Sequence, residues 1–286
     1  MVRQAAPLVA APPATSFTRQ PRTMAPADWQ QELRANIARV RQCIVTACRR
    51  AHRNQADVRL VAVTKYVSTD VLRAVMAAGI VDIGESHAQQ LVARARQCGA
   101  ARLDWSDDTT ATPRLVEPPS TPPRWHMIGH LQRNKVKMLL PHARVIHSLD
   151  SARLAEALEQ QAAQLAAMVD VFIEVNVAAE AAKTGAAIDA VPALLRVVAA
   201  CPHLILRGLM TMAPYDPDPE TARPHFARLR QFLAQLRDTG AVGPACVHLS
   251  MGMSHDYTIA VEEGATLVRV GAALFEGLPS GDPRTE

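Results

Sequence analysis

Residues 59–64 read RLVAVT, a short run rich in Val and Leu, and an amphipathic helical pattern follows over about 69–78. The same alternation of an apolar run and a helical pattern recurs along the chain, with eight runs in all. The other seven runs are VDIG (81–84), WHMIG (125–129), RVIHSL (144–149), VDVFIEVNV (169–177), LILRGLMTM (204–212), CVHLS (246–250) and TLVRVG (266–271). Further helical patterns separate them, at about 86–97, 131–139, 151–166, 188–200, 218–238 and 255–263. Because parallel strands need crossover connections, this alternation predicts an α/β fold with a parallel sheet.

The number of strand and helix units predicts how the sheet closes. Eight units in the part of the chain after residue 25 match a single (β/α)8 TIM barrel, which typically has about 250 residues. A doubly wound sheet is the alternative, but it normally has fewer strands at this length, and no G-x-G-x-x-G follows the first strand. We therefore predict one barrel domain over residues 26–286, which begins with a helix from about Asp28. Residues 1–25 are rich in Pro and Ala and lack acidic residues, so we expect a disordered tail there. A Pro- and Thr-rich loop from about 103 to 124 is expected to be a surface insertion.

The composition excludes several classes of protein. The chain has 286 residues, 49% of them hydrophobic and 20% charged, with a formal net charge of +4, which is typical of a globular protein with a sizeable core. It has no uninterrupted apolar run of about 18 residues, so we expect no membrane-spanning helix. Aromatic residues make up 4%, which is too little stacking surface for nucleic-acid binding. The five cysteines are scattered and form no C-x-x-C pair, which predicts reduced thiols and a cytoplasmic location.

Lysine is rare in this chain, and one lysine lies at the carboxyl end of a predicted strand. Of the 31 basic residues 27 are Arg, and the lysines are Lys65, Lys135, Lys137 and Lys183. Lys65 ends the stretch VAVTK, at the carboxyl end of the first predicted strand, where barrel enzymes place their chemistry. Desolvation at the mouth of an apolar barrel favours the neutral, nucleophilic amine. The alternative is that Lys65 extends its ammonium group into water. The preference for Arg elsewhere favours imine formation at Lys65, because Arg cannot form an imine.

The last two predicted strands carry candidate phosphate ligands. Arg269 lies within the apolar run TLVRVG, so it either points outward or enters the barrel and finds an acceptor there. Gly271 and Ala272 open a turn toward a helical stretch, and the loops after strands seven and eight commonly bind phosphate in such barrels. Ser250 and Ser254 lie in the neighbouring loop and add hydroxyl and amide donors. Together with Lys65, these residues place a lysine, an arginine and candidate phosphate donors at one rim.

Two other polar clusters favour less specific interpretations. His126 and His130 have the spacing of a metal-binding H-x-x-x-H pair, but they straddle a strand and a loop and no Glu follows His126, so we expect no zinc site. The stretch HLQRNKVK (130–137) carries Lys135 and Lys137 near a helix start. A solvated basic face is the preferred interpretation of this stretch, and a second anion site is the alternative.

The motifs together resemble the pyridoxal phosphate homeostasis family. The match extends from about residue 33 to residue 277, with seven motifs in the family's order. The motifs are VAVTK from Val61, DIGES from Asp82, RWHMIGHLQRNKV from Arg124, IHSLDSARLA from Ile146, VNVAAEAAKTG from Val175, RGLMTMAP from Arg207 and LSMGMSHDYTIAVEEGATLVRVGAALFEG from Leu249.

The resemblance implies a fold, a cofactor and a set of ligands. The fold is a barrel like the amino-terminal domain of alanine racemase, and Lys65 holds pyridoxal 5'-phosphate (PLP) as an internal aldimine. Arg269 contacts the pyridine nitrogen, while Ser254 and the amides of Gly271 and Ala272 hold the phosphate. Such proteins carry and buffer the cofactor without a settled catalytic turnover.

The chain departs from the family at two positions. Many members have Asn where this chain has Ser86, so a contact near the cofactor ring is expected to be shortened or replaced by water. Many have Thr or Ser where this chain has Ala272, which removes a hydroxyl and keeps the backbone amide. We expect cofactor binding to survive both changes.

The residues favour carriage of the cofactor over catalysis. Arginine stays protonated, so against a pyridine nitrogen it leaves that nitrogen unprotonated, and the ring is then a weak electron sink. The alternatives are a PLP-dependent amino-acid racemase or lyase that uses Tyr66, Tyr257 or a rim histidine as base, and a Schiff-base aldolase without cofactor. Expected partners are the small-molecule cofactor and PLP-requiring apoenzymes, with no nucleic acid or membrane, and we expect a monomer or weak dimer.

Overall fold

A computed structural model describes residues 26–99, 122–178 and 184–278. The predicted tail over 1–25 lies outside these ranges, as does most of the predicted insertion at about 103–124. Within the described ranges, no helix combines the length and the apolar character that a membrane crossing requires.

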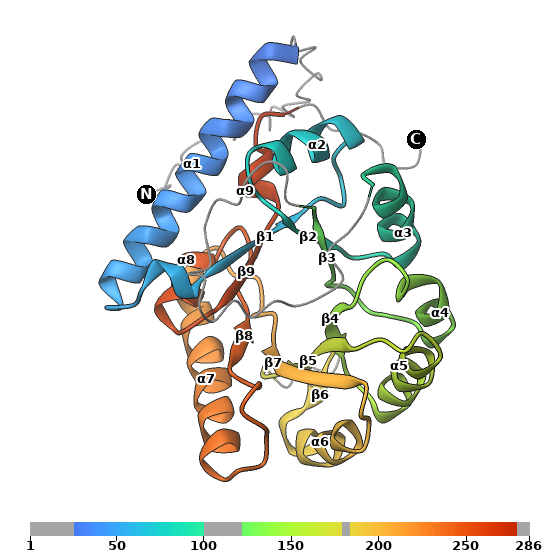
Figure 1. Cartoon of the computed structure of the whole chain (residues 1–286). Coiled ribbons are helices and arrows are strands. Elements are labelled where there is room, and N and C mark those ends of the chain that lie inside the picture. Colours follow the sequence, from blue (N-terminus) through green and yellow to red (C-terminus); the bar gives the residue numbers. More distant parts are fainter. Residues whose placement is uncertain (1–25, 100–121, 179–183, 279–286) are drawn as a thin grey trace, which may run out of the picture.

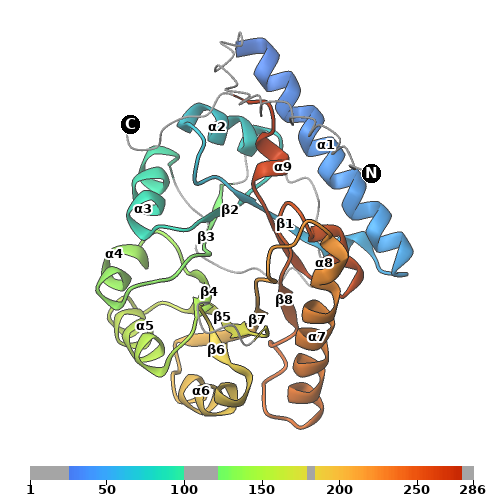
Figure 2. The same cartoon turned by 180° about the vertical axis from the view of Figure 1, so that it is seen from behind.

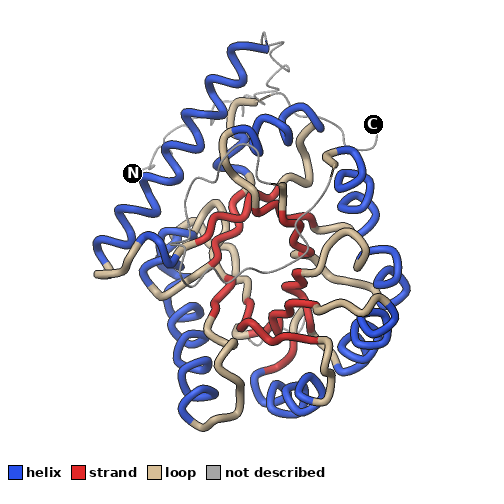
Figure 3. Tube along the Cα trace, in the orientation of Figure 1, coloured by secondary structure: helices blue, strands red, loops and turns tan. Residues whose placement is uncertain are grey.

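Eight parallel strands form the centre of the molecule, which Figure 3 shows as a ring of strands inside a ring of helices. They are β1 (Arg59–Val63), β2 (Asp82–Glu85), β3 (Arg124–Met127), β4 (Val145–Leu149), β5 (Val169–Asn176), β7 (Leu204–Met210), β8 (His248–Ser250) and β9 (Leu267–Val270). The hydrogen-bonded order is β4-β3-β2-β1-β9-β8-β7-β5, and pairing between β4 and β5 closes the barrel. Every strand coincides with a predicted run to within two residues at each end. The predicted TIM barrel is therefore confirmed.

The helices surround this barrel in both views (Figures 1 and 2). They are α1 (Pro26–Arg50), α2 (Thr69–Ala77), α3 (Ala88–Gln97), α4 (Val136–Leu139), α5 (Ala152–Gln164), α6 (Val191–Ala199), α7 (Arg223–Asp238), α8 (Tyr257–Glu262) and α9 (Ala272–Phe275). The predicted helices at about 131–139, 188–200 and 218–238 each begin with a 3-10 turn. Pro192 and Pro224 lie in the first turns of α6 and α7, because proline suits a position whose N–H has no helical acceptor.

One strand was not predicted. β6 (Ala186–Ala187) pairs in parallel with the end of β5, where Val175 lies opposite Ala186 and Asn176 lies opposite Ala187. A two-residue strand has no periodicity, so the sequence pattern cannot reveal it. β6 extends the sheet beyond the eight barrel strands.

The first helix is tied to the carboxyl-terminal rim of the barrel. The buried residues Leu33, Ile37, Val40 and Ile44 form one face of α1, as their spacing predicts. Asn36 on the same helix is also fully buried, and its Nδ2 donates to the carbonyl oxygens of Leu274 at 3.1 Å and Glu276 at 2.9 Å. These bonds fix α1 against α9, the short helix that follows the last strand.

The core consists of two apolar clusters. The larger one lies between the strands and the helices and includes most of the buried aliphatic residues. The smaller one consists of five buried side chains on barrel strands, which are Val61, Val145, Phe172, Met210 and Leu267. Because one face of every barrel strand turns inward, this smaller cluster shares the interior with buried polar side chains, and these belong to the candidate site.

Candidate functional site

Lys65 lies two residues beyond the end of β1, where it is half-buried. Its Nζ lies 4.9 Å from the centre of the exposed Tyr66 ring. The backbone around it is held by side chains of α3. Nε2 of Gln90 donates to the carbonyl oxygen of Lys65 at 3.1 Å, and Arg94 donates to the carbonyls of Thr64 and Val67, each at 2.5 Å. The lysine therefore stands in a loop whose path is fixed on both sides.

A buried ion pair with Glu85 orients Arg94 so that it holds the backbone on either side of Lys65. Nη1 of Arg94 lies 2.7 Å from Oε1 of Glu85, the last residue of β2, and both side chains are almost completely buried. The Thr64 hydroxyl donates to the same carboxylate oxygen. Burial raises the pKa of Glu85, against the lowering effect of Arg94 and Thr64. Oε2 of Glu85 accepts no hydrogen bond from the described residues. The Glu85–Arg94 pair that supports the Lys65 loop therefore uses one of the two carboxylate oxygens.

A hydroxyl and one backbone amide form a second group of donors after the ends of β8 and β9. Oγ of Ser254 accepts hydrogen bonds from the backbone N–H groups of Gly271 at 3.0 Å and Ala273 at 3.3 Å. Because the oxygen already accepts two bonds, the Ser254 hydroxyl hydrogen is available as a donor. Among the described residues, no acceptor is found for the N–H of the exposed Ala272. Ser254 and Ala272 thus offer an O–H and an N–H to an anion, while the Gly271 N–H is already used.

The Ser254 hydroxyl and the Ala272 N–H together form the Ser254 cradle. It lies near Lys65 because β1 and β9 are neighbours in the barrel. Ala62 lies opposite Val270 in their parallel pairing, so Lys65 and Gly271 both follow the same end of the sheet. The chain at Gly271 passes close to β1. A Cβ atom at Gly271 would lie 3.1 Å from the carbonyl oxygen of Val63 and 3.3 Å from its Cβ.

Arg269 enters the barrel, as one of the two predicted alternatives requires. It is 3% exposed, and its Nη1 donates to Oγ of Ser250 at 2.7 Å while its Nη2 donates to the carbonyl oxygen of Thr211 at 3.0 Å. Burial lowers its pKa to about 10, against the opposing effect of the Glu174 and Asp256 carboxylates. The guanidinium therefore remains charged at neutral pH.

Ser250 is placed differently from its predicted role. Its hydroxyl is fully buried and contacts both Arg269 and Nδ1 of His147, the latter at 2.7 Å. It therefore supports Arg269, and its hydroxyl is not among the donors that face the Ser254 cradle.

The contact between Ser250 and His147 begins a line of buried polar side chains across the barrel. Nε2 of His147 lies 2.9 Å from Nδ1 of His126, and Nε2 of His126 lies 2.9 Å from Oδ1 of Asp82. Both histidines are fully buried. Burial lowers the pKa of each imidazole, so both are neutral at pH 7.

Asp82 anchors the far end of this line. Its Oδ1 lies 2.8 Å from Nη1 of Arg124 and its Oδ2 lies 3.6 Å from Nη1 of Arg59. Burial by itself would raise the pKa of Asp82. The charges of Arg59 and Arg124 and the hydrogen bond from His126 outweigh burial and hold the pKa well below its usual range.

The remaining predicted residues lie apart from one another. His130 is half-exposed at the rim and pairs with Asp150 at 3.3 Å, whereas His126 is inside the barrel, so the two histidines do not converge. Among the described residues, no group of three His, Cys, Asp or Glu side chains is arranged to hold a metal ion. Ser86 directly follows β2, and its Oγ lies 3.1 Å from Nδ1 of its neighbour His87.

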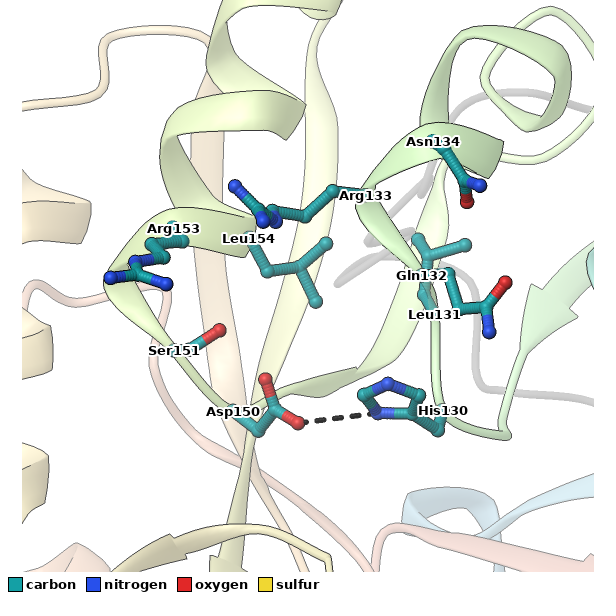
Figure 4. Close-up of a pocket in the computed structure, with 9 residues that line it drawn as sticks. All are labelled: His130, Leu131, Gln132, Arg133, Asn134, Asp150, Ser151, Arg153 and Leu154. Carbon is teal, nitrogen blue, oxygen red and sulfur yellow. Dashed lines mark ion pairs between the residues drawn. The ribbon is translucent and has the colours of Figure 1, made fainter.

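The basic stretch at 130–137 contributes to a rim cavity of about 620 Å³. Figure 4 shows the Arg133 and Arg153 side chains extending into the same space, with the His130–Asp150 ion pair at its edge. Both arginines are exposed. The preferred interpretation, a solvated basic face, accounts for this arrangement.

Tyr66 and Tyr257, the two candidate bases of the racemase alternative, lie in different surroundings. Tyr66 is 65% exposed beside Lys65, whereas Tyr257 is 8% exposed. Burial and contact with Cys43 on α1 raise the pKa of the Tyr257 phenol. The phenol is therefore protonated at neutral pH and is a poor candidate for a general base.

Comparisons with known proteins show the family of this chain. The family model described as "Alanine racemase, N-terminal domain" matches residues 30–279. A Pseudomonas aeruginosa protein named "Pyridoxal phosphate homeostasis protein" is 37% identical over 253 residues, which cover 87% of this chain and 96% of the relative. An Aquifex aeolicus protein of the same name is 36% identical over 239 residues, which cover 84% and 95%. The chain belongs to the pyridoxal phosphate homeostasis family. The predicted resemblance is confirmed.

A solved structure with cofactor provides a further comparison. PipY from Synechococcus elongatus with PLP bound has a TM-score of 0.67 and 27% sequence identity, covering 85% of this chain and 99% of PipY. The similarity covers almost the whole of PipY.

The predicted site residues do not include Asp82, His147 or Arg94. Asp82 and His147 each lie in a quoted apolar run, in VDIG and RVIHSL. A charged or polar residue within such a run is the available signal, since a buried polar group needs a partner. Arg94 lies in a helical pattern and its buried pairing has no comparable signal in the sequence.

We predict that Asp82→Asn destabilises the protein in a pH-dependent manner. Removing one partner of a buried ion pair lowers the free energy of unfolding by about 3 kcal/mol at pH 7. The folded-state pKa of Asp82 is depressed, so its contribution is complete above the unfolded-state pKa of about 3.9 and declines as the pH falls through and below that value. Urea unfolding at pH 7, 4 and 3 measures the difference between wild type and variant.

The control is Asp70→Asn, because Asp70 is an exposed acid paired with Arg73 on the surface. It should change the free energy of unfolding by less than about 0.5 kcal/mol. A difference between wild type and Asp82→Asn that is unchanged from pH 7 to pH 3 would contradict the assigned ionisation of Asp82.

Proposed function

We propose that the protein binds PLP at Lys65, holds it reversibly and delivers or buffers it. The observation that carries this proposal is the position of Lys65 beside the Ser254 and Ala272 donors, on the neighbouring strands β1 and β9. The names of the relatives and the PLP bound to PipY support the choice of cofactor.

The residues of the site fit this cofactor. PLP has an aldehyde, a phosphate and a pyridine nitrogen, and the site offers a primary amine, a pair of neutral donors and a buried guanidinium. The Ser254 hydroxyl and the Ala272 amide are free to donate to phosphate oxygens, and hydrogen bonds to a charged acceptor are stronger than those between neutral groups. Gly271 contributes the close approach of the backbone to β1.

Lys65 makes the covalent attachment in this proposal. When bound, PLP supplies an aldehyde that reacts reversibly with amines. Nζ of Lys65 would attach to that aldehyde with loss of one water molecule, and an incoming amine would displace Nζ and leave Lys65 as the free amine. Gln90 and Arg94 hold the lysine loop during both steps.

Arg269 favours storage over turnover. A guanidinium only donates hydrogen bonds, so against the pyridine nitrogen it leaves that nitrogen unprotonated. Strong electron withdrawal into the ring needs a protonated nitrogen, which a carboxylate partner provides in many PLP enzymes. The Tyr257 phenol, which stays protonated at neutral pH because burial raises its pKa, also weighs against the alternative of a racemase or lyase.

The proposal includes a cellular setting. All five cysteines are free thiols, which supports the expected cytoplasmic location. PLP-requiring apoenzymes are the proposed recipients, and the proposed state is a monomer or weak dimer.

We predict that Lys65→Ala abolishes the visible absorption band of bound PLP after the protein has been mixed with PLP and desalted. The reason is that only the covalent bond to Nζ retains the chromophore through desalting. The matched control is Lys137→Ala, because Lys137 is exposed on α4, and it should retain the band of the wild type. A Lys65→Ala protein as yellow as the wild type would refute the assignment.

A second prediction concerns the phosphate donors. PLP should bind at least about 100-fold more tightly than pyridoxal, because two charge-assisted hydrogen bonds contribute about 1.5–3 kcal/mol each. Ser254→Ala should weaken PLP binding about tenfold and leave pyridoxal binding unchanged. Titrations of both proteins with both ligands measure this. Equal losses for the two ligands would place Ser254 elsewhere than at the phosphate.

A further inference from the structure

We propose that Asp82, His126, His147 and Ser250 form a one-directional chain of hydrogen bonds that positions Arg269 for the cofactor ring. This inference rests on the proposed PLP-binding function and adds four residues to it. The members come from β2, β3, β4 and β8, and the chain crosses the barrel interior to Arg269 on β9.

The chemistry at the Asp82 end determines the direction of the first bonds. An ionised carboxylate only accepts, so Nε2 of His126 carries the hydrogen that is donated to Asp82 at 2.9 Å. Because His126 is neutral, its Nδ1 has no hydrogen and accepts. The donor to it is then Nε2–H of His147, at 2.9 Å.

The chemistry at the Arg269 end continues the same direction. A guanidinium only donates, so Oγ of Ser250 accepts from Nη1 at 2.7 Å. Nδ1 of neutral His147 has no hydrogen when its Nε2 does, so it accepts the Ser250 hydroxyl hydrogen at 2.7 Å. Every donor therefore points from Arg269 toward Asp82, and both histidines are Nε2–H tautomers.

The members of the chain are buried and closely packed. Asp82, His126, His147, Ser250 and Arg269 are each at most 6% exposed. The His147 ring stacks on Phe172 of the inner apolar cluster, with ring centres 4.6 Å apart and an angle of 20° between the planes. A buried polar chain with all its bonds made holds one arrangement.

The consequence for the site is the orientation of Arg269. Nη1 is held by Ser250 and Nη2 by the Thr211 carbonyl, so two of the five guanidinium hydrogens are fixed within the barrel wall. The remaining hydrogens keep a defined direction for a ligand. His147 acts through Ser250, and it is therefore a positioning residue for Arg269.

Nuclear magnetic resonance of the protein without added PLP tests the direction of the chain. Long-range ¹H–¹⁵N spectra at pH 7, with His126 and His147 assigned from their single variants, should show a protonated Nε2 and an unprotonated Nδ1 in both rings. A protonated Nδ1 in either ring would overturn the chain, whatever the protein binds.

Variants test the positioning role. His147→Phe keeps an aromatic ring against Phe172 but removes both nitrogens, and Ser250→Ala removes the link to Arg269. Each should weaken PLP binding about tenfold, the loss expected for one hydrogen bond to a charged group, and shift the absorption maximum of bound PLP. The double variant should lose no more than the weaker-binding single variant, because both act through one chain.

The matched control is His203→Phe, since His203 also contacts a carboxylate, Glu159 at 2.7 Å, but lies outside the barrel interior. It should bind PLP like the wild type, and urea unfolding confirms that each variant is folded. Unchanged affinity and spectrum in His147→Phe, or additive losses in the double variant, would refute the positioning role while PLP binding by the wild type stands. A wild type that binds no PLP would refute the proposed function and the positioning role together, and would leave the tautomer result as a property of the barrel.

Discussion

The charge of Arg269 is the constraint on which the barrel interior depends. A guanidinium that is 3% exposed needs acceptors, because an unpaired buried charge is strongly destabilising. Ser250 and the Thr211 carbonyl supply them directly, and the two histidines connect Ser250 to the carboxylate of Asp82. Asp82 in turn is neutralised by Arg59 and Arg124. One buried cation therefore accounts for polar residues on five strands.

The same barrel holds Lys65 by a separate device. Glu85 and Arg94 form a buried ion pair that is not part of the hydrogen-bonded chain from Asp82 to Arg269. Arg94 also donates hydrogen bonds to backbone carbonyls on either side of Lys65. The lysine loop and the Arg269 side chain are thus fixed by independent networks that meet only at the rim. Such an arrangement suits the proposed exchange of a small molecule, since a change at Lys65 would leave the Arg269 network in place.

The repeating apolar runs predict the barrel because a parallel strand and its crossover helix each leave a clear pattern. Lys65, Ser254 and Gly271 are proposed as site residues because they follow strand ends, where barrels of this kind commonly place their chemistry. The hydrogen bonds of the Ser250 hydroxyl to His147 and Arg269 could not be predicted, because whether this hydroxyl faces the rim or the interior depends on the neighbouring strands. The pairing of His126 with His147 joins β3 and β4, and Ser250 joins them from β8. The spacing of residues along the sequence does not indicate such contacts between separate strands. β6 is too short for any pattern.

Borohydride reduction of the PLP-loaded protein, followed by proteolysis and peptide mass measurement, tests the attachment to Lys65 most directly. Reduction makes the bond between the amine and the cofactor permanent, so the modified residue can be identified. The expected result is one phosphopyridoxyl group per chain, on the peptide that contains Lys65. A label on Lys135, Lys137 or Lys183, or one spread among all four lysines, would contradict the site described for this protein.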